Sequence, residues 1–246
     1  MARVFIGVGH GGDDPGAIGR VVEETANLTI AMELMRILKT YGITVGISRT
    51  KDENDRLAEE ISEANAFKPD IAVEVHNNAG GGDGFEVYVQ TNAYKAKSKA
   101  LAQAIEAQVK AMGQKNRGIK TKLRADGADH FGWLRQVKAP AVLLEGFFVD
   151  SKDALDFDTV AEQKKLAAAY AQGVVNFLGI KKPTAAATVS GGKGYLAQIA
   201  AGTKIYADAG EVEKTGVYTI TEERDGMGKL LSGAGWVNLS NVKKGV

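Results

Sequence analysis

The chain has 246 residues, a net charge of +1 and no cysteine. Its length suits one enzyme-sized domain with a small second module. The near-neutral charge argues against a nucleic-acid binder, which needs clustered lysine and arginine to neutralise phosphates. Because cysteine is absent, disulfides and thiolate metal sites are excluded, and any metal has to be held by histidine, aspartate or glutamate.

The first 180 residues alternate between strand and helix patterns. The expected elements are a strand near 3–9, a helix near 25–40, a strand near 43–48, a helix near 53–67, strands near 70–76 and 85–89, a helix near 94–112, a strand at 141–144 and a helix ending near Leu178. This alternation predicts an α/β domain whose twisted, mostly parallel sheet is covered by helices on both faces.

The pattern breaks at residues 181–193, where proline, serine and glycine predict a linker. Beyond it the periodicity becomes two, in short segments at 204–207, 216–222 and 235–239, with Gly- and Asp-rich turns such as 225–228 between them. We therefore expect a first domain at 1–180 and a small all-β, barrel-like module at 194–246. Four aromatic residues are available there for a minor core or a binding face: Tyr195, Tyr206, Tyr218 and Trp236.

Neither a signal peptide nor a membrane span is visible in the sequence. The N-terminus lacks a basic start, an apolar stretch and a small-residue cleavage site. No run of about 18 apolar residues occurs anywhere in the chain. We expect no membrane insertion and no export by a signal of its own.

Polar side chains stand at the ends of three apolar runs. The run at 4–8 is followed by His10, the run at 71–75 by His76, and the run at 141–144 by Glu145. Because α/β enzymes bind ligands at the ends of central strands, these side chains are candidates for one site. The glycines, aspartates and proline after His10 let the backbone bend tightly around whatever the imidazole holds.

Two of these side chains suit a metal. Catalytic zinc takes three protein ligands and leaves a position for water, whose pKa it lowers to about 7. His10 and His76 offer two ligands, and Glu23 or Glu24 at the start of the first expected helix offers the third. A hydrogen-bonded structural histidine is the alternative for each ring, but the shared position at strand ends favours a metal. His130 is interpreted as lining a pocket or lying on the surface.

Glu145 follows four apolar residues in an expected buried strand. Burying an unpaired carboxylate costs several kcal/mol, so Glu145 has to be paired, metal-bound or catalytic. A general base beside a metal-bound water meets that requirement, and a salt bridge with Arg135 or Lys138 is the alternative. Glu86 is a weaker candidate for the same role, and strand alternation could turn Glu74 towards solvent.

Short motifs follow one another between about residues 3 and 178: HGGDDPGAIG, Glu23 with Asn27-Leu28 behind it, SRT at 48–50, NA at 65–66, VHNNA, GFEVY and PAVLLEGFF. In this order they resemble the zinc-dependent N-acetylmuramoyl-L-alanine amidases of the amidase-3 family. The resemblance implies a His–Glu–His zinc set in which the glutamate precedes an asparagine by four positions. It therefore selects Glu23 over Glu24, with His10 and His76 as the other ligands of one Zn²⁺.

The resemblance also implies the reaction. The family's catalytic glutamate lies in a PAVLVE-type segment, which corresponds to Glu145 here. The substrate would be peptidoglycan, cut at the amide between the lactyl group of N-acetylmuramic acid and the L-alanine of the stem peptide. Glu145 would take a proton from the bound water and pass it to the amine. Asn77 and Asn78 would either bind substrate carbonyls or orient the loop after His76, and His130 is a further candidate for substrate binding.

One departure from the family is the opening. Family members often read DPGHGG, whereas Gly7-Val8-Gly9 precede His10 in this chain. The difference alters the approach of the backbone and leaves the ligand unchanged.

The C-terminal segments VYTITEE and GKLLSGAGWVNLS resemble bacterial SH3-like wall-binding domains. Residues 181–246 carry nine Lys or Arg against six Asp or Glu, which indicates either a solvated face or a weak attraction to anionic secondary wall polymers. An amidase without a signal peptide, joined to such a module, has the layout of phage endolysins, which wait in the cytoplasm until a membrane pore releases them. A bacterial autolysin released by mother-cell lysis would have the same layout.

Two other function classes remain open at this point. One is a non-catalytic cell-wall-binding protein whose amidase half is inactive, against which the intact candidate residues argue. The other is a different zinc hydrolase, such as a carboxypeptidase or a deacetylase, acting on another wall bond.

Overall fold

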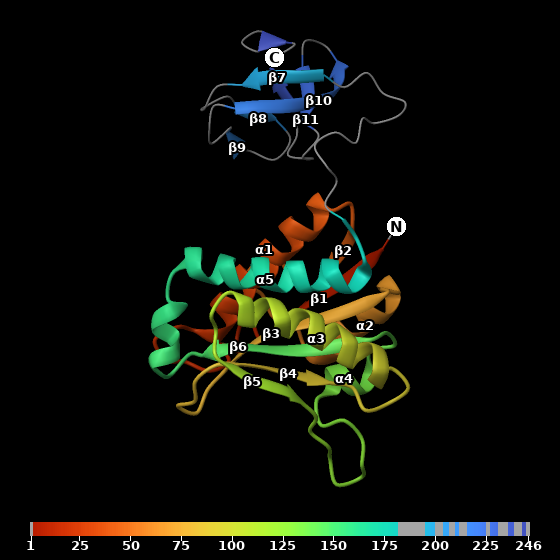
Figure 1. Cartoon of the computed structure of the whole chain (residues 1–246), viewed down its shortest axis with the longest axis vertical. Coiled ribbons are helices and arrows are strands. Elements are labelled where there is room, and N and C mark those ends of the chain that lie inside the picture. Colours follow the sequence, from red (N-terminus) through yellow and green to blue (C-terminus); the bar gives the residue numbers. More distant parts are fainter. Residues whose placement is uncertain are drawn as a thin grey trace. The chain divides into compact units, whose positions relative to one another are not determined.

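The structure is a computed structural model (Figure 1). It describes residues 2–181 and, beyond them, 195–199, 204–206, 210–211, 216–224, 227–230, 236–238 and 243–244. The chain divides into two compact units, Met1–Lys182 and Pro183–Val246. Among the described helices, none combines the length and the apolar character that crossing a membrane requires.

The first unit is built on a six-stranded sheet in the order β2-β1-β3-β6-β4-β5. Its strands are β1 Arg3–Val8, β2 Thr44–Ile47, β3 Ile71–Asn78, β4 Phe85–Val89, β5 Asn116–Lys120 and β6 Ala141–Phe148. β2, β1, β3 and β6 run parallel, whereas β4 is antiparallel to β6 and parallel to β5. The predicted mostly parallel sheet is confirmed, and the three strands that end in polar residues, β1, β3 and β6, are neighbours.

Helices cover both faces of this sheet (Figure 1). They are α1 Glu23–Thr40, α2 Leu57–Phe67, α3 Lys95–Ala111, α4 Gly132–Gln136 and α5 Val160–Leu178, with a short 3₁₀ helix at Lys152–Asp156. α1, α3 and α5 pack on one face and enclose the larger hydrophobic core, while α2 and α4 cover the other face. The α/β architecture expected from the sequence is therefore observed.

Alternation along the central strands decides which face carries the polar side chains. Ala72 and Leu143 belong to the smaller core under α2 and α4. Side chains two residues apart on a strand share a face, so His76 on β3 and Glu145 on β6 lie on that same face, nearer the carboxyl ends of the strands. The two residues are also register partners.

Glu74 corrects one expectation from the sequence. Alternation alone left it free to face solvent, but its side chain is buried, with a relative exposure of 2%. The reason is that α2 covers this face of the sheet and brings a second buried carboxylate, Glu60, to the same place.

The second unit is an antiparallel sheet in the order β13-β7-β10-β11-β12-β8-β9. Its strands are β7 Tyr195–Ile199, β8 Lys204–Tyr206, β9 Gly210–Glu211, β10 Gly216–Arg224, β11 Met227–Leu230, β12 Trp236–Asn238 and β13 Lys243–Lys244. The segments expected near 204–207, 216–222 and 235–239 correspond to β8, β10 and β12. Ile220 and Val237 are buried. Almost all of the expected linker and the side chains of the four aromatic residues lie outside the described residues.

Candidate active site

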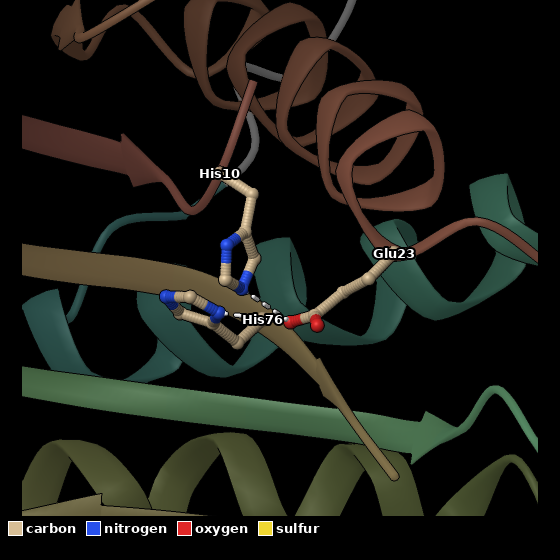
Figure 2. A group of neighbouring side chains, drawn as sticks. All are labelled: His10, Glu23 and His76. Atoms are coloured by element: carbon tan, nitrogen blue, oxygen red, sulfur yellow. Dashed lines mark hydrogen bonds and ion pairs between the residues drawn. The ribbon is translucent and has the colours of Figure 1, made fainter. Parts of the chain in front are cut away.

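Three side chains converge beside the carboxyl ends of β1 and β3 (Figure 2). His10 follows β1, Glu23 is the first residue of α1, and His76 lies on β3. Glu23 Oε1 is 2.9 Å from His76 Nδ1 and 3.3 Å from His10 Nε2. The donor atoms of the three residues all lie within 4.8 Å of one another. They therefore form a compact group that could hold a metal ion.

The backbone around His10 is shaped to admit these side chains. His10 itself has a φ of 64°, a left-handed conformation that is uncommon for a residue with a β-carbon. A β-carbon at Gly9 would lie 2.2 Å from His76 Cε1, and one at Gly16 would lie 2.6 Å from His10 Cδ2 and 2.7 Å from Glu23 Oε2. Only glycine leaves room for the cluster at these two positions.

The Glu23 carboxylate is fixed by backbone donors. Ala17 N donates to Oε2 at 2.9 Å and Asn77 N donates to Oε1 at 3.2 Å. Asn27, one turn further along α1, accepts from Asn77 Nδ2 at 2.8 Å and donates to the Gly9 carbonyl at 2.9 Å. The asparagine four residues after Glu23 therefore ties α1 to both histidine-bearing segments.

Arg49, in the SRT motif at 48–50, is a further residue that shapes the site. Its guanidinium is buried, with the residue 1% exposed, and donates to the carbonyl oxygens of Val8, Gly9 and Glu24. Arg49 thus anchors the segment before His10 to the start of α1. The only sequence signal for this role is the position of Arg49 directly after the second expected strand.

The electrostatic field within the cluster favours positive charge. Burial opposes ionisation of Glu23, but its hydrogen bonds with His10 and His76 hold the pKa of its carboxyl well below the usual range. Burial likewise disfavours charge on both rings, yet Glu23 raises the pKa of each of them above the usual value. The carboxylate stays ionised, and the same field that draws a proton to either ring attracts a cation.

Glu145 lies next to His76 across the β3–β6 pair and next to Glu86 across the β6–β4 pair. Its Oε2 atom is buried without a hydrogen-bond partner. Arg135, an alternative partner, donates instead to the Asp129 carbonyl at 2.8 Å. Burial raises the pKa of Glu145 to about 7, which is the range in which a group can both accept and release a proton near neutral pH.

Glu86 has the opposite environment. It accepts hydrogen bonds from Asn78 Nδ2 at 3.1 Å and Arg117 Nε at 2.6 Å, and Lys120 Nζ is also bonded to it. Burial raises the pKa of Glu86, but Lys120 and Arg117 outweigh burial and lower it below the usual value. Glu86 is therefore held ionised by its hydrogen-bond partners. The neighbouring Glu145 has one carboxyl oxygen without a hydrogen-bond partner.

The three residues considered for substrate binding, Asn77, Asn78 and His130, have different surroundings in the structure. Asn77 is 2% exposed and points into the contacts with Glu23 and Asn27 described above. Asn78 bonds Glu86, so both asparagines make contacts that orient the end of β3. His130 lies on the surface in the loop after β5, with its ring edge against Phe131.

A family model described as N-acetylmuramoyl-L-alanine amidase matches residues 4–176. The chain belongs to this family. The match covers nearly all of the α/β unit, from the second residue of β1 into the last turn of α5, and includes every residue of the cluster. The chain is therefore an N-acetylmuramoyl-L-alanine amidase, a peptidoglycan hydrolase, and the enzyme class expected from the sequence is confirmed.

Similar proteins agree with this membership. The amidase is 31% identical over 232 residues to the N-acetylmuramoyl-L-alanine amidase CwlM of Bacillus licheniformis, covering 92% of this chain and 86% of that one. It is 35% identical over 190 residues to the endolysin of Bacillus phage SPP1, covering 73% and 67%. The solved catalytic domain of CwlV, an amidase from Bacillus (Paenibacillus) polymyxa var. colistinus, superposes with a TM-score of 0.65 at 28% identity, covering 74% of this chain and all of that one.

Proposed function

We propose that the amidase works with one zinc ion held by His10, Glu23 and His76, and that Glu145 transfers the protons of the reaction. The observation that carries the proposal is the convergence of two imidazole nitrogens and one carboxylate oxygen within 4.8 Å, beside a buried carboxyl group in register with His76. Nitrogen and oxygen donors in this number suit a catalytic zinc, which takes three protein ligands and keeps one position open.

The charge balance of the cluster supports a cation. Within residues 2–181, Glu23 pairs with the two histidines and with no lysine or arginine. A buried carboxylate without a permanent positive partner is costly, and a bound divalent ion would supply that charge. When bound, zinc polarises a carbonyl oxygen and makes water more acidic, which is the Lewis-acid chemistry that amide hydrolysis needs.

Glu145 supplies the proton transfers. Hydrolysis requires the attacking water to lose a proton and the leaving amine to gain one. The Glu145 carboxylate accepts the proton from water and then gives it to the nitrogen of L-alanine as the carbon–nitrogen bond breaks. The products are the lactyl carboxylic acid of N-acetylmuramic acid and a stem peptide with a free L-alanine amino terminus.

Digestion of purified cell walls tests this function. The full chain, with and without a chelator, is incubated with walls, and the new chain ends are identified. We expect L-alanine amino termini that disappear with the chelator and return with added zinc. Released acetate would instead indicate a deacetylase, and a free terminal amino acid a carboxypeptidase. Chelator-insensitive release of L-alanine termini would contradict the zinc assignment.

We also propose that residues 194–246 form an SH3-like wall-binding module, joined by a linker at 181–193 to the catalytic domain of residues 1–180. Two observations support it. The second unit is an antiparallel sheet of short strands, and the similarity to CwlM extends past the α/β unit. Cosedimentation of the full chain and of residues 1–182 with purified walls tests the module. Walls stripped of anionic secondary polymers show whether these polymers are its ligand.

The similarity to a phage endolysin supports a lytic role, in which the amidase stays in the host cytoplasm until a membrane pore gives it access to the wall. Expression in a host cell with and without a pore-forming protein tests this role. Lysis only when the pore is present is the expected result.

Asn78 and His130 remain our candidates for contacts with the glycan or the stem peptide. We assign Asn77 to holding Glu23. Substitution of His130 by alanine would raise KM with kcat unchanged if its ring contacts substrate.

A further inference from the structure

Glu74 is a second buried carboxylate beside the candidate metal cluster. It lies on β3 two residues before His76, and its Oε1 is 3.4 Å from His76 Nε2. The other ring nitrogen of His76, Nδ1, faces Glu23 Oε1 at 2.9 Å. Each nitrogen of the imidazole therefore faces a different carboxylate.

His10 shows the same arrangement. Its Nε2 faces Glu23 at 3.3 Å, and its Nδ1 lies 2.8 Å from Asp14 Oδ2. Histidines that bind metals commonly donate the proton of their second nitrogen to a carboxylate, which fixes the tautomer and the ring orientation and makes the ligating nitrogen more basic. Two histidines with this pattern around one shared glutamate are consistent with such a role for both outer carboxylates.

We propose that Glu74 is a positioning residue for His76: it keeps the ring proton on Nε2, so that Nδ1 is presented beside Glu23 as a metal ligand. This inference rests on the proposed zinc site. It assigns to Glu74 an effect on metal affinity and on the ring tautomer, without direct contact with substrate.

The glycine at position 7 makes this arrangement possible. Gly7 on β1 is the register partner of Glu74. A β-carbon at Gly7 would lie 2.2 Å from Glu74 Oε2 and 2.8 Å from Glu60 Oε1. A side chain at position 7 and the carboxyl group of Glu74 therefore compete for one space. In the Gly7-Val8-Gly9 opening, the lack of a side chain at Gly7 on β1 makes room for the carboxylate of Glu74 on β3.

Glu60 supports Glu74 from α2. Its Oε1 accepts hydrogen bonds from Val8 N at 2.8 Å and Ser48 Oγ at 2.9 Å. Burial, followed by the negative charge of Glu74, raises the pKa of Glu60 well above its usual value. A proton on Glu60 leaves one negative charge on the pair and provides a donor for Glu74 Oε2, which is buried with no other partner.

Zinc affinity of the full chain tests the proposal, measured by competition with a chromophoric chelator. Glu74→Gln keeps the shape of the side chain and removes its charge, and we expect zinc affinity to fall by about 10-fold, within the 10–100-fold range typical of such partners. The matched control is Asp153→Asn, at a carboxylate that is also buried but bonds the backbone of Gly84 and Phe148. We expect it to lower the Tm and leave zinc affinity unchanged. Equal zinc affinity of Glu74→Gln and wild type would overturn the proposal.

A measurement on the chain with Glu74 intact makes the test independent of any Glu74 variant. In the zinc-loaded chain with ¹⁵N-labelled histidine, we expect NMR to show the His76 proton on Nε2 and no proton on Nδ1. His130→Gln removes the signals of the surface histidine and simplifies the assignment. A proton on Nδ1 with the metal at Nε2 would refute the role of Glu74. If the wild type binds no zinc at all, the proposed function fails instead, so the two failures are distinguishable.

Discussion

His76 and Glu145 are register partners on the neighbouring parallel strands β3 and β6. Strands in a sheet are about 4.8 Å apart, so the sheet itself fixes the spacing between the candidate metal ligand and the candidate base. Neither side chain depends on a flexible loop for its position. Their proposed roles, metal ligand for His76 and base for Glu145, can therefore be separated by substitution.

Glu145→Gln should slow catalysis strongly while leaving the metal site intact. The amide cannot accept the proton of the attacking water, and loss of a general base typically costs about 10²–10⁴-fold in rate. We expect the release of L-alanine amino termini to fall by at least about 100-fold, with zinc content and Tm close to wild type. Glu86→Gln is the control, because Glu86 is already occupied by Arg117 and Lys120. An equal loss in Glu86→Gln with activity retained in Glu145→Gln would reverse the assignment.

The pH dependence of kcat/KM should have an acidic limb that belongs to Glu145. Burial raises the pKa of this carboxyl to about 7, and only the deprotonated form can act as the base. A cation on the cluster favours the carboxylate, so the apparent pKa of the limb should lie at or below about 7, with a tenfold fall for each pH unit below it. The negative charges of Glu23 and Glu86 raise the pKa of Glu145, and His76 lowers it. A residual activity of Glu145→Gln that retains the same limb would contradict the prediction.

Gly7→Ala should destabilise the fold through its contact with Glu74. The Gly7 backbone is outside the left-handed region, so alanine itself is tolerated there, but its β-carbon would lie 2.2 Å from Glu74 Oε2. Overpacking of this kind costs about 1–3 kcal/mol. Unfolding in urea of the two single variants and of Gly7→Ala/Glu74→Ala should give a coupling energy of about 0.5–3 kcal/mol. Simple additivity would mean that the two positions do not compete.

Glu60→Gln should become more stabilising, relative to wild type, as the pH rises. The folded-state pKa of Glu60 is raised above its usual 4.5, so above that pH the unfolded chain releases a proton that the folded chain retains. Wild-type stability then falls as the pH rises towards the folded-state pKa, by up to about 1.4 kcal/mol per pH unit. Glutamine removes this dependence.

Urea unfolding at pH 5, 6, 7 and 8 measures the difference between Glu60→Gln and wild type. Glu59→Gln, at an exposed residue of the same helix, controls for the loss of one negative charge. A difference that stays constant or shrinks with pH would show that Glu60 is not protonated in the folded chain.

The parts of the fold that were predictable are those with strong local patterns. Long apolar runs identified β1, β3 and β6, and the helix patterns between the expected strands identified α1, α2, α3 and α5. β5 went unrecognised because an edge strand paired only with β4 needs no apolar run, and its sequence NRGIK has none. α4 is a five-residue helix, too short to show a period.

The candidate site was predictable where a residue sits at the end of an apolar run, as His10, His76 and Glu145 do. The surroundings of Glu74 were not, since its burial depends on α2 covering that face and on the missing side chain of Gly7. Arg49 likewise bonds carbonyl oxygens of segments distant in sequence, which leaves no periodic signal.

β6 lies between β3 and β4 in the sheet although it follows both of them in the chain. The sheet of the first unit can close only after residues 141–148 have been synthesised and inserted between two earlier strands. A nascent chain that ends before β6 therefore lacks Glu145, the proposed base beside His76. On the proposed assignment of Glu145, hydrolysis of the cell wall has to wait until β6 has been synthesised and paired with β3.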